Sequence, residues 1–446
     1  MIRSVLFNSI LLFACLFSEG AFRQQGSLEG HWEGAVVRGN AVRIVRVDFV
    51  KEGDGLKAIF DIPDFLTWAL RPQAVTYAPP KVTVRIPLMG DASLEVDDGK
   101  GEMTGVLGAS TPPVTIHLRR ALKPVEARII KEEVQFQNGD VTLSATLVLP
   151  NTKGPHPAIV WIQGRGGRIR EDTARVKIFA QHGIASLIYD KRGGGKSTGN
   201  FAAATMSDLA SDAQAAVEFL SKREGIDPKQ IGLHGESAGG WIAPLVAARS
   251  RVPVAFVMTS SGPAESVRDQ QIHAYPYVLR WSDQKYSDEE IAAAEEYARR
   301  RMRVVYDRQG QAEYEASVAR LKGMSAGKAL LEPPASDAED IDWLRRNGYD
   351  PGPDLKKITV PYLAFYGGRD GIVPPDENVK KLEKYLTEAG NRDFKIVTIP
   401  GTGHDLSYPD GPPARSENSP WMWGRVAPGY VDVMLDWLLK RVRVAR

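Results

Sequence analysis

Ser237 lies at the centre of Gly235-Glu236-Ser237-Ala238-Gly239, and its setting predicts a nucleophile. The short apolar run at 230–233 is typical of a buried strand, and the Ala- and Gly-rich run at 238–248 is typical of a helix. A serine in a tight turn between such elements has its hydroxyl exposed above the edge of the sheet. Side chains at the two glycines would collide with backbone in that turn. The alternative is a Gly-rich turn that merely packs closely.

A candidate base and a candidate acid follow this serine in the sequence. A serine hydroxyl is a weak nucleophile and needs a positioned base. His404 lies in a Gly-rich loop directly after the apolar run 394–399, and Asp370 follows the run 362–366. An acid at that position would fix the imidazole tautomer and stabilise the imidazolium. The chain order serine, aspartate, histidine is that of enzymes whose nucleophile sits in a Gly-x-Ser-x-Gly turn.

Both assignments have alternatives. His404 could be a loop histidine that bonds only to backbone, and Asp370 could cap the helix that follows Pro374-Pro375. Asp405 is a rival acid, which we disfavour because adjacent residues rarely place their side chains face to face. We therefore predict a catalytic triad of Ser237, Asp370 and His404.

The tetrahedral intermediate of acyl transfer also needs two backbone N–H donors. We expect one from Ala238, the residue after the nucleophile. The second should come from the loop 163–167, where glycines let backbone approach the substrate oxygen. We predict the N–H of Arg165, with Gly164 and Gly166 as alternatives, and we place Gly164 at the substrate. The Arg165 side chain should lie near the pocket mouth, where it either selects polar or anionic substrates or pairs at the surface.

Alternating strand and helix patterns from about residue 126 must position these side chains. A hairpin is predicted first, with Asn138-Gly139-Asp140 as its turn. Continuous apolar runs then alternate with helical periods such as 206–222, which favours a parallel sheet covered on both faces. The predicted strands of this part are 128–136, 141–149, 156–162, 184–189, 230–233, 252–259, 362–366 and 394–399.

The stretch 264–357 interrupts the alternation of strands and helices. It has helical patterns, notably at 288–305 and 311–322, and no predicted strand. An insertion at this place would cover the strand ends as a cap. Tyr275, Tyr277 and Trp281 are candidates to line the substrate pocket beneath it; the alternative is that they form the core of the cap.

Residues 27–121 form a separate all-β segment in this prediction. Short runs rich in Val, Ile and Phe at 41–49, 56–60, 81–87 and 114–118 are separated by Gly, Asp and Pro turns, which indicates a small sandwich or barrel. We find no catalytic constellation there. It is interpreted as a packing domain, with a ligand-binding role as the alternative.

Residues 1–20 are predicted to be a secretory signal peptide. Arg3 is followed by an almost wholly apolar stretch that is too short for a convincing membrane span. The alternatives are a buried element, an uncleaved anchor or a lipoprotein anchor through Cys15, the single cysteine. We expect a secreted or periplasmic mature chain without a stable membrane span and without disulfides.

The overall composition excludes several classes of function. The 446 residues suggest two domains, and 43% hydrophobic with 25% charged residues are ordinary for a soluble globular protein. A net charge of +2 gives no case for nucleic-acid binding. Gly193-Gly194-Gly195-Lys196-Ser197 resembles a P-loop end, but Asp190 replaces the glycine that this motif requires. We predict no nucleotide, no other cofactor and no metal site.

Four motifs in one order carry a resemblance to a known superfamily. They are Gly235-Glu236-Ser237-Ala238-Gly239-Gly240, Tyr189-Asp190-Lys191-Arg192-Gly193, Gly367-Gly368-Arg369-Asp370 and Gly403-His404. With them the chain resembles the α/β-hydrolases. It looks closest to secreted bacterial serine carboxylesterases, whose β-domain precedes a catalytic domain related to dienelactone hydrolases and prolyl-oligopeptidase-type peptidases. The resemblance covers about 126–443 and is looser over 27–121.

The resemblance implies that residues 126–446 form an α/β-hydrolase domain, with a helical cap at about 264–357. It also implies hydrolysis of a small-molecule ester through a serine acyl-enzyme. Many relatives carry His-Gly where this chain has Gln163-Gly164. A peptidase or an amide or thioester hydrolase is the first alternative, because the triad does not separate leaving groups. A non-catalytic binding protein on a hydrolase scaffold is the second. The oligomeric state stays open.

Overall fold

The computed structural model describes most of the chain after residue 27. The described residues are 28–38, 41–53, 55–62, 67–72, 74–86, 90–108, 113–123, 128–165, 169–170, 174–282, 284–331, 337–408, 425–427 and 429–444. The predicted signal peptide 1–20, with Cys15, lies outside them. The chain divides into two compact units, one holding Met1–Phe60 and Arg71–Lys123, the other Asp61–Leu70 and Pro124–Arg446. In the part that is described, no helix has both the length and the apolar character that a membrane crossing requires.

The larger unit, which holds the predicted triad, is built on an eight-stranded sheet with the order β10-β11-β13-β12-β14-β15-β16-β17. β11 runs antiparallel to both of its neighbours, and the strands from β13 to β17 are parallel. The bounds are β10 (Ile129–Asn138), β11 (Val141–Pro150), β12 (His156–Ile162), β13 (Ala185–Tyr189), β14 (Ile226–Glu236), β15 (Val257–Ser260), β16 (Tyr362–Gly367) and β17 (Phe394–Ile399). The predicted hairpin is confirmed, because Asn138 pairs with Val141 and Gly139 has a φ of +57°.

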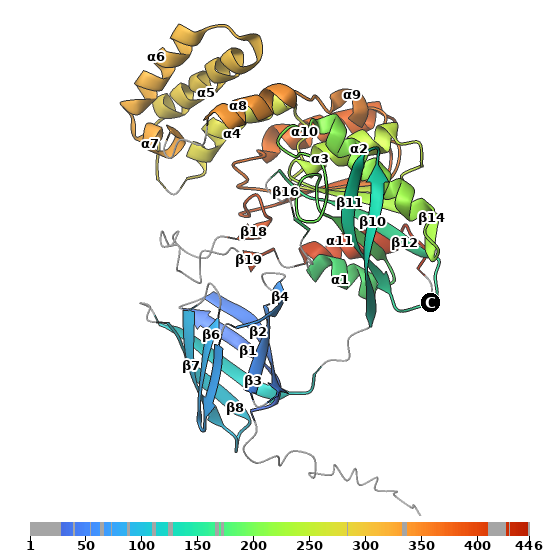
Figure 1. Ribbon diagram of the computed structural model, residues 1–446. Helices are drawn as coiled ribbons and strands as arrows, with labels where there is room; N and C mark the ends of the chain where they lie inside the picture. Colours follow the sequence, from blue (N-terminus) through green and yellow to red (C-terminus); the bar gives the residue numbers. More distant parts are fainter. Residues whose placement is uncertain are drawn as a thin grey trace, which may run out of the picture. The chain divides into compact units, whose positions relative to one another are not determined.

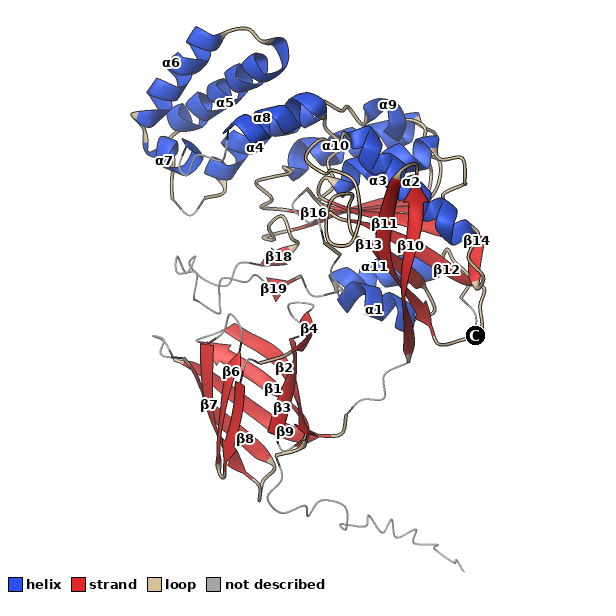
Figure 2. Cartoon of the chain, viewed as in Figure 1, coloured by secondary structure: helices blue, strands red, loops and turns tan. Residues whose placement is uncertain are grey.

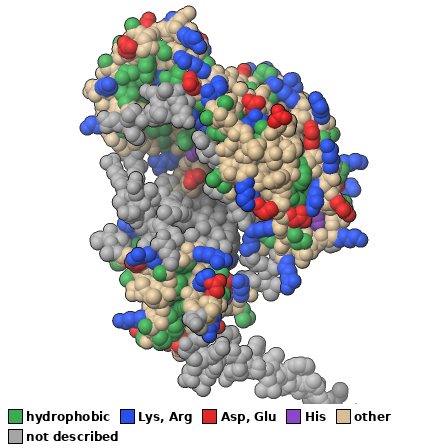
Figure 3. Space-filling view, viewed as in Figure 1, with side chains coloured by type: hydrophobic (Ala, Val, Ile, Leu, Met, Phe, Trp, Pro, Cys, Tyr) green, Lys and Arg blue, Asp and Glu red, His purple; other side chains and the backbone are tan. Residues whose placement is uncertain are grey.

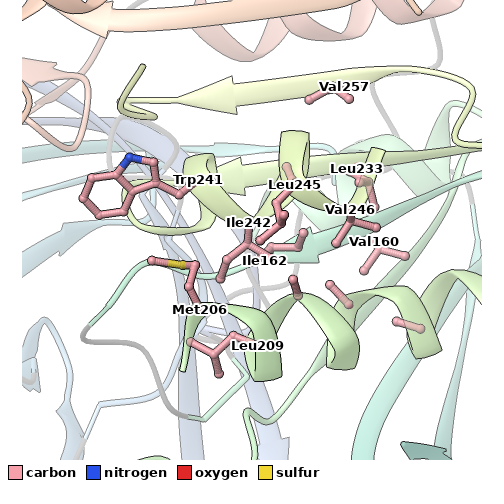
Figure 4. Packing of buried hydrophobic residues seen from close by; sticks show 14 of the residues in the cluster. Val160, Ile162, Met206, Leu209, Leu233, Trp241, Ile242, Leu245, Val246 and Val257 are labelled. Carbon is pink, nitrogen blue, oxygen red and sulfur yellow. The ribbon is translucent and has the colours of Figure 1, made fainter. Parts of the chain in front are cut away.

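Helices cover both faces of this sheet (Figures 1 and 2). α1 (Ala174–Gln181) and α11 (Tyr430–Leu439) pack on one face, and α2 (Met206–Ser221), α3 (Gly239–Arg249) and α10 (Pro375–Glu388) pack on the other. β12, β13 and β16 are buried along their whole length, which explains their continuous apolar runs. Figure 4 shows the core where α2 and α3 meet the sheet, with Ile242, Leu245 and Val246 of α3 facing Ile162 and Val160. The predicted α/β-hydrolase fold is confirmed.

The stretch between β15 and β16 is helical, as predicted, and no strand occurs in its described residues. It holds α4 (Val267–Arg280), α5 (Asp288–Met302), the π-helical turn η3 (Arg303–Asp307), α6 (Gln311–Lys322), α7 (Ser325–Leu331), α8 (Asp337–Arg346) and α9 (Gly352–Leu355). α5 begins where Ser287 and Glu290 form a capping box. α4 to α7 enclose a small apolar cluster of their own around Leu279, Tyr297 and Leu321, and they form the arm at the upper left of Figure 1.

The strands before residue 122 form a single antiparallel sheet that curls round on itself (Figure 1). Its order is β4-β3-β2-β1-β9-β8-β7-β6-β5, with β1 (Gly30–Arg38), β2 (Ala41–Glu52), β3 (Gly55–Ile62), β4 (Thr67–Leu70), β5 (Ala74–Ala78), β6 (Lys81–Ile86), β7 (Gly90–Asp97), β8 (Glu102–Leu107) and β9 (Val114–Ala121). Alternate residues of these strands, among them Trp32, Val47 and Met103, are fully buried. Positive and negative side chains are interspersed over the face of the larger unit that Figure 3 shows.

Candidate active site

Ser237 occupies a strained turn between β14 and α3. Its φ of +51° lies in the left-handed region, which non-glycine residues rarely adopt. A Cβ on Gly235 would lie 2.2 Å from the carbonyl oxygen of Gly239, and a Cβ on Gly239 would lie 2.3 Å from that of Ile162. Both glycines are therefore required by close backbone approach, the reason expected from the sequence. The turn is held by a hydrogen bond from the Ser237 N–H to the Ser260 carbonyl.

The structure brings Ser237, His404 and Asp370 together from three separate loops at the carboxyl ends of β14, β17 and β16. The Nε2 atom of His404 lies 2.8 Å from the Ser237 hydroxyl oxygen, and its Nδ1 atom lies 2.8 Å from Asp370 Oδ2. Because a carboxylate only accepts, Nδ1 carries the ring proton and Nε2 is left free to take the serine proton. The arrangement can generate a serine nucleophile.

Backbone contacts fix the acid and the base. Asp370 is fully buried, and its Oδ1 accepts hydrogen bonds from the N–H groups of Ile372 and Val373. The Ser261 hydroxyl donates to the carbonyl of His404. These bonds leave Asp370 Oδ2 facing the imidazole. The rival acid Asp405 instead accepts from the N–H and hydroxyl of Ser407 in its own loop.

The pKa of His404 is raised above its ordinary value of 6.5. Burial lowers it, but the hydrogen bond and the negative charge of Asp370 outweigh the burial. A general base must be unprotonated, so activity should be lost as the pH falls through this pKa. We expect an acidic limb of kcat/KM for a p-nitrophenyl ester centred above pH 6.5. A pH–rate profile checks this, and a limb centred below pH 6 would contradict it.

The two predicted oxyanion donors flank the serine. Ala238 stands at the start of α3, where the first N–H groups of a helix have no partner inside the helix. Arg165 follows Gly164 in the loop after β12, and this loop lies against the nucleophile: a Cβ on Gly164 would lie 3.0 Å from the Cβ of Ser237. The alternative donor Gly166 lies outside the described residues.

Gly164→Ala tests this close approach. The added methyl group would lie 3.0 Å from the Cβ of Ser237 and 3.3 Å from the carbonyl oxygen of Glu236, so the loop must retreat by a few tenths of an ångström. We expect kcat to fall by ~10- to 100-fold with a small change in melting temperature, because small displacements in a positioned site are costly. Gly323→Ala is the control, since its nearest neighbour is 3.4 Å away and its φ is ordinary. Equal activity of the two variants would contradict the prediction.

Ser237 and His404 open into a cavity of about 540 Å³. Its lining is mainly apolar and aromatic and comes from strand ends, α1 and the cap. The lining residues besides the catalytic candidates include Trp161, Ile162, Val176, Ile188, Trp241, Pro263, Gln270, Gln271, Trp343, Ile372 and Val373. Gly164 and Arg165 line it as well. A cavity of this size and character suits a small, largely apolar substrate.

The structure does not bring the predicted substrate-binding residues Tyr275 and Trp281 to this cavity. Tyr275 packs against Tyr297 inside the cap, with ring centroids 5.5 Å apart, and Trp281 is 47% exposed on the cap surface. Tyr277 is buried and donates its hydroxyl proton to the Gly368 carbonyl. For Tyr275 the alternative from the sequence, packing within the cap, describes its surroundings, whereas Tyr277 joins the cap to the loop after β16.

Sequence reasoning missed two features of the cavity wall. Trp343 of α8 lies under the Arg165 guanidinium, whose carbon is 4.2 Å from the centre of the Trp343 ring. Arg175 of α1 donates to Glu236, and its charge, against the opposing effect of burial, lowers the pKa of that carboxyl. Glu236 could have been noticed because it sits inside the elbow motif, whereas no local signal marks Arg175 or Trp343.

No group of three or more metal-ligating side chains occurs among the residues that the structure describes.

Comparison with known proteins adds a family match. The model of the family described as X-Pro dipeptidyl-peptidase (S15 family) matches residues 138–402, a stretch that runs from the turn of the first hairpin to the loop before His404.

Individual relatives are more distant. Esterase EstD of Thermotoga maritima is 24% identical over 319 residues, which cover 68% of each chain. Quorum-quenching protein AidA of Acinetobacter baumannii is 36% identical over 112 residues, which cover 24% of this chain and 36% of AidA. A structure of Est1E from Butyrivibrio proteoclasticus with bound ferulic acid has a TM-score of 0.41 and 17% identity, covering 69% of this chain and 96% of Est1E.

Proposed function

The chain belongs to the S15 family, whose description is X-Pro dipeptidyl-peptidase, and we propose that within this family it acts as a serine carboxylesterase. It is a hydrolase of the α/β superfamily. The observation that carries the proposal is the pair of hydrogen bonds that links Ser237 to His404 and His404 to Asp370. Ser237 and His404 line a largely apolar cavity. The name of the relative EstD also supports an ester substrate.

In the proposed reaction Ser237 attacks the ester carbonyl while His404 takes its proton. The backbone N–H groups of Ala238 and Arg165 hold the oxyanion. His404 then passes the proton to the leaving alcohol, and the acyl-enzyme is hydrolysed by water along the same route. Asp370 keeps the imidazole in its tautomer throughout.

A dipeptidyl-peptidase is the second candidate, favoured by the family match. Such an enzyme must recognise the positive amino end of a peptide. Two carboxylates line the cavity, Glu236 and Asp405, and both have partners within the protein: Arg175 for the first and Ser407 for the second. An ester of an apolar acid makes no such demand, which is why we rank esterase first.

The test compares the two bond types on one protein. A fluorophosphonate probe should label Ser237, and p-nitrophenyl esters from acetyl to long acyl should be cleaved with higher kcat/KM than an X-Pro p-nitroanilide. The ester profile would measure the acyl length that the cavity accepts. Faster cleavage of the anilide would make the peptidase the correct assignment. Failure of the probe to label Ser237 would contradict both the esterase and the peptidase proposals.

A further inference from the structure

We propose that Lys191 is a positioning residue of the oxyanion hole, acting through the peptide group that joins Gly164 to Arg165. The inference rests on the proposed function, because it concerns how the site stabilises a developing negative charge. Lys191 is the second residue after β13, and the oxyanion loop follows the neighbouring parallel strand β12. Both segments therefore emerge at the same edge of the sheet.

The contact itself is direct. The ammonium of Lys191 donates a hydrogen bond to the carbonyl oxygen of Gly164, and its nitrogen lies 5.2 Å from the centre of the Phe201 ring. Lys191 is only 4% exposed, so its charge sits inside the protein rather than in solvent. Burying a cation is costly unless it is well partnered. A buried ammonium aimed at the oxyanion loop thus suggests a role beyond packing.

The flanking residues of Lys191 hold it in place. Asp190 accepts from the backbone and side chain of Arg170 and from the backbone N–H of Lys196. Arg192 on the other side forms a two-point ion pair with Asp212. With both neighbours anchored, the loop presents Lys191 to Gly164 in a defined position.

The geometry of a peptide group connects this contact to the oxyanion. A peptide bond is planar and trans, so the carbonyl of Gly164 and the N–H of Arg165 point in opposite directions. Fixing the carbonyl fixes the N–H. A charged donor on the carbonyl also polarises the amide and makes its N–H a stronger donor. Lys191 would therefore both aim and strengthen the Arg165 donor without touching substrate.

Lys191→Met tests the proposal, because it keeps the length and apolar stem and removes the charge and the donor. We expect kcat on a p-nitrophenyl ester to fall by ~10- to 100-fold with KM within about threefold, less than the ~10²- to 10³-fold typical of losing a donor outright. The rate of fluorophosphonate labelling at Ser237 and the affinity of an alkyl boronic acid should also fall, because negative charge builds up on the phosphoryl oxygen during labelling and the boronate adduct is an anion, and both use the same N–H donors.

The controls separate position from stability. Lys196→Met removes an exposed lysine of the same loop and should leave all three measurements unchanged. Lys191→Arg retains a cation and a donor and should recover at least part of the lost kcat. If Lys191→Met does not fold, as judged by circular dichroism, Lys191→Gln takes its place as the neutral variant.

Two failures are distinguishable. Labelling of the wild type together with equal labelling and equal kcat of the neutral variant would overturn the role of Lys191 and leave the esterase proposal standing. A loss confined to KM would also overturn it, since that would indicate a substrate contact. An unlabelled wild type would overturn the proposed function and this inference with it.

Discussion

Ser237→Ala is expected to lower kcat for ester hydrolysis by about 10⁵- to 10⁶-fold, the largest single effect that we predict. Alanine removes the hydroxyl that lies 2.8 Å from His404 Nε2 and retains Cβ. Since serine and alanine carry the same strain at a φ of +51°, the melting temperature should stay within a few degrees. Initial rates on the best p-nitrophenyl ester, with fluorophosphonate labelling, measure the effect.

Ser250→Ala is the matched control for this prediction. It lies at the opposite end of α3, so it changes the same kind of side chain on the same helix, far from the reaction. We expect wild-type kcat. Comparable turnover by the Ser237 and Ser250 variants would mean that the observed hydrolysis does not depend on the elbow serine.

Asp370→Asn is expected to lower kcat by ~10⁴-fold while the fold is retained. Oδ1 of Asp370 accepts from the N–H groups of Ile372 and Val373, and an asparagine carbonyl can keep both bonds. The amide NH₂ then faces Nδ1 of His404 and donates to it. That reverses the tautomer, places the ring proton on Nε2 and leaves no atom to accept the serine proton.

The pH profile gives this second prediction a separate signature. The charge of Asp370 contributes to raising the pKa of His404, so its loss should move the acidic limb of the residual activity to lower pH. Asp405→Asn serves as the comparison: Asp405 is engaged with Ser407 and contributes less than Asp370 to raising the pKa of His404, so its loss should move the acidic limb less. A larger kcat loss for the Asp405 variant than for the Asp370 variant would reassign the acid.

Much of the catalytic unit could be predicted because its signals are local. β12 and β17 have the predicted bounds, and the predicted helix at 311–322 is α6. The helix predicted at 288–305 ends in the structure at Met302 and continues as the π-helical turn η3. The strand predicted at 252–259 is shorter, Val257–Ser260, because only its second half pairs with β14 and β16.

Several strands of the N-terminal unit could not be predicted. β7 has the sequence GDASLEVD, and among residues 91–97, whose burial the structure describes, Ala92, Leu94 and Val96 are the buried ones. Three apolar residues among glycine and acidic side chains are a weak signal, because one face of this strand is solvated. The pattern becomes a strand only when β6 and β8 pair with it on both sides.

The same limit applies to the site. Ser237, Asp370 and His404 each lie in a motif that predicts a catalytic role. In the structure His404 lies within hydrogen-bond distance of both Ser237 and Asp370. Trp343 and Arg175 lie in no motif, and the motif that contains Lys191 does not indicate what its side chain contacts. Their proximity to the cavity or to the oxyanion loop comes from the strand order and from the path of the cap. Neither can be derived from the spacing of residues in the sequence.

The helical stretch between β15 and β16 has a consequence for how this protein could diversify. Parallel neighbouring strands need a long crossover in any case, and this one begins with α4 and ends with α8 and α9. Residues of α4 and α8 line the cavity. The middle helices α5 to α7 share an apolar cluster with the end of α4. Lengthening such a connection costs little, about 0.6 kcal/mol for each doubling of a flexible loop. Evolution, or an engineer, could exchange these middle helices and alter substrate range while the reacting residues keep their places.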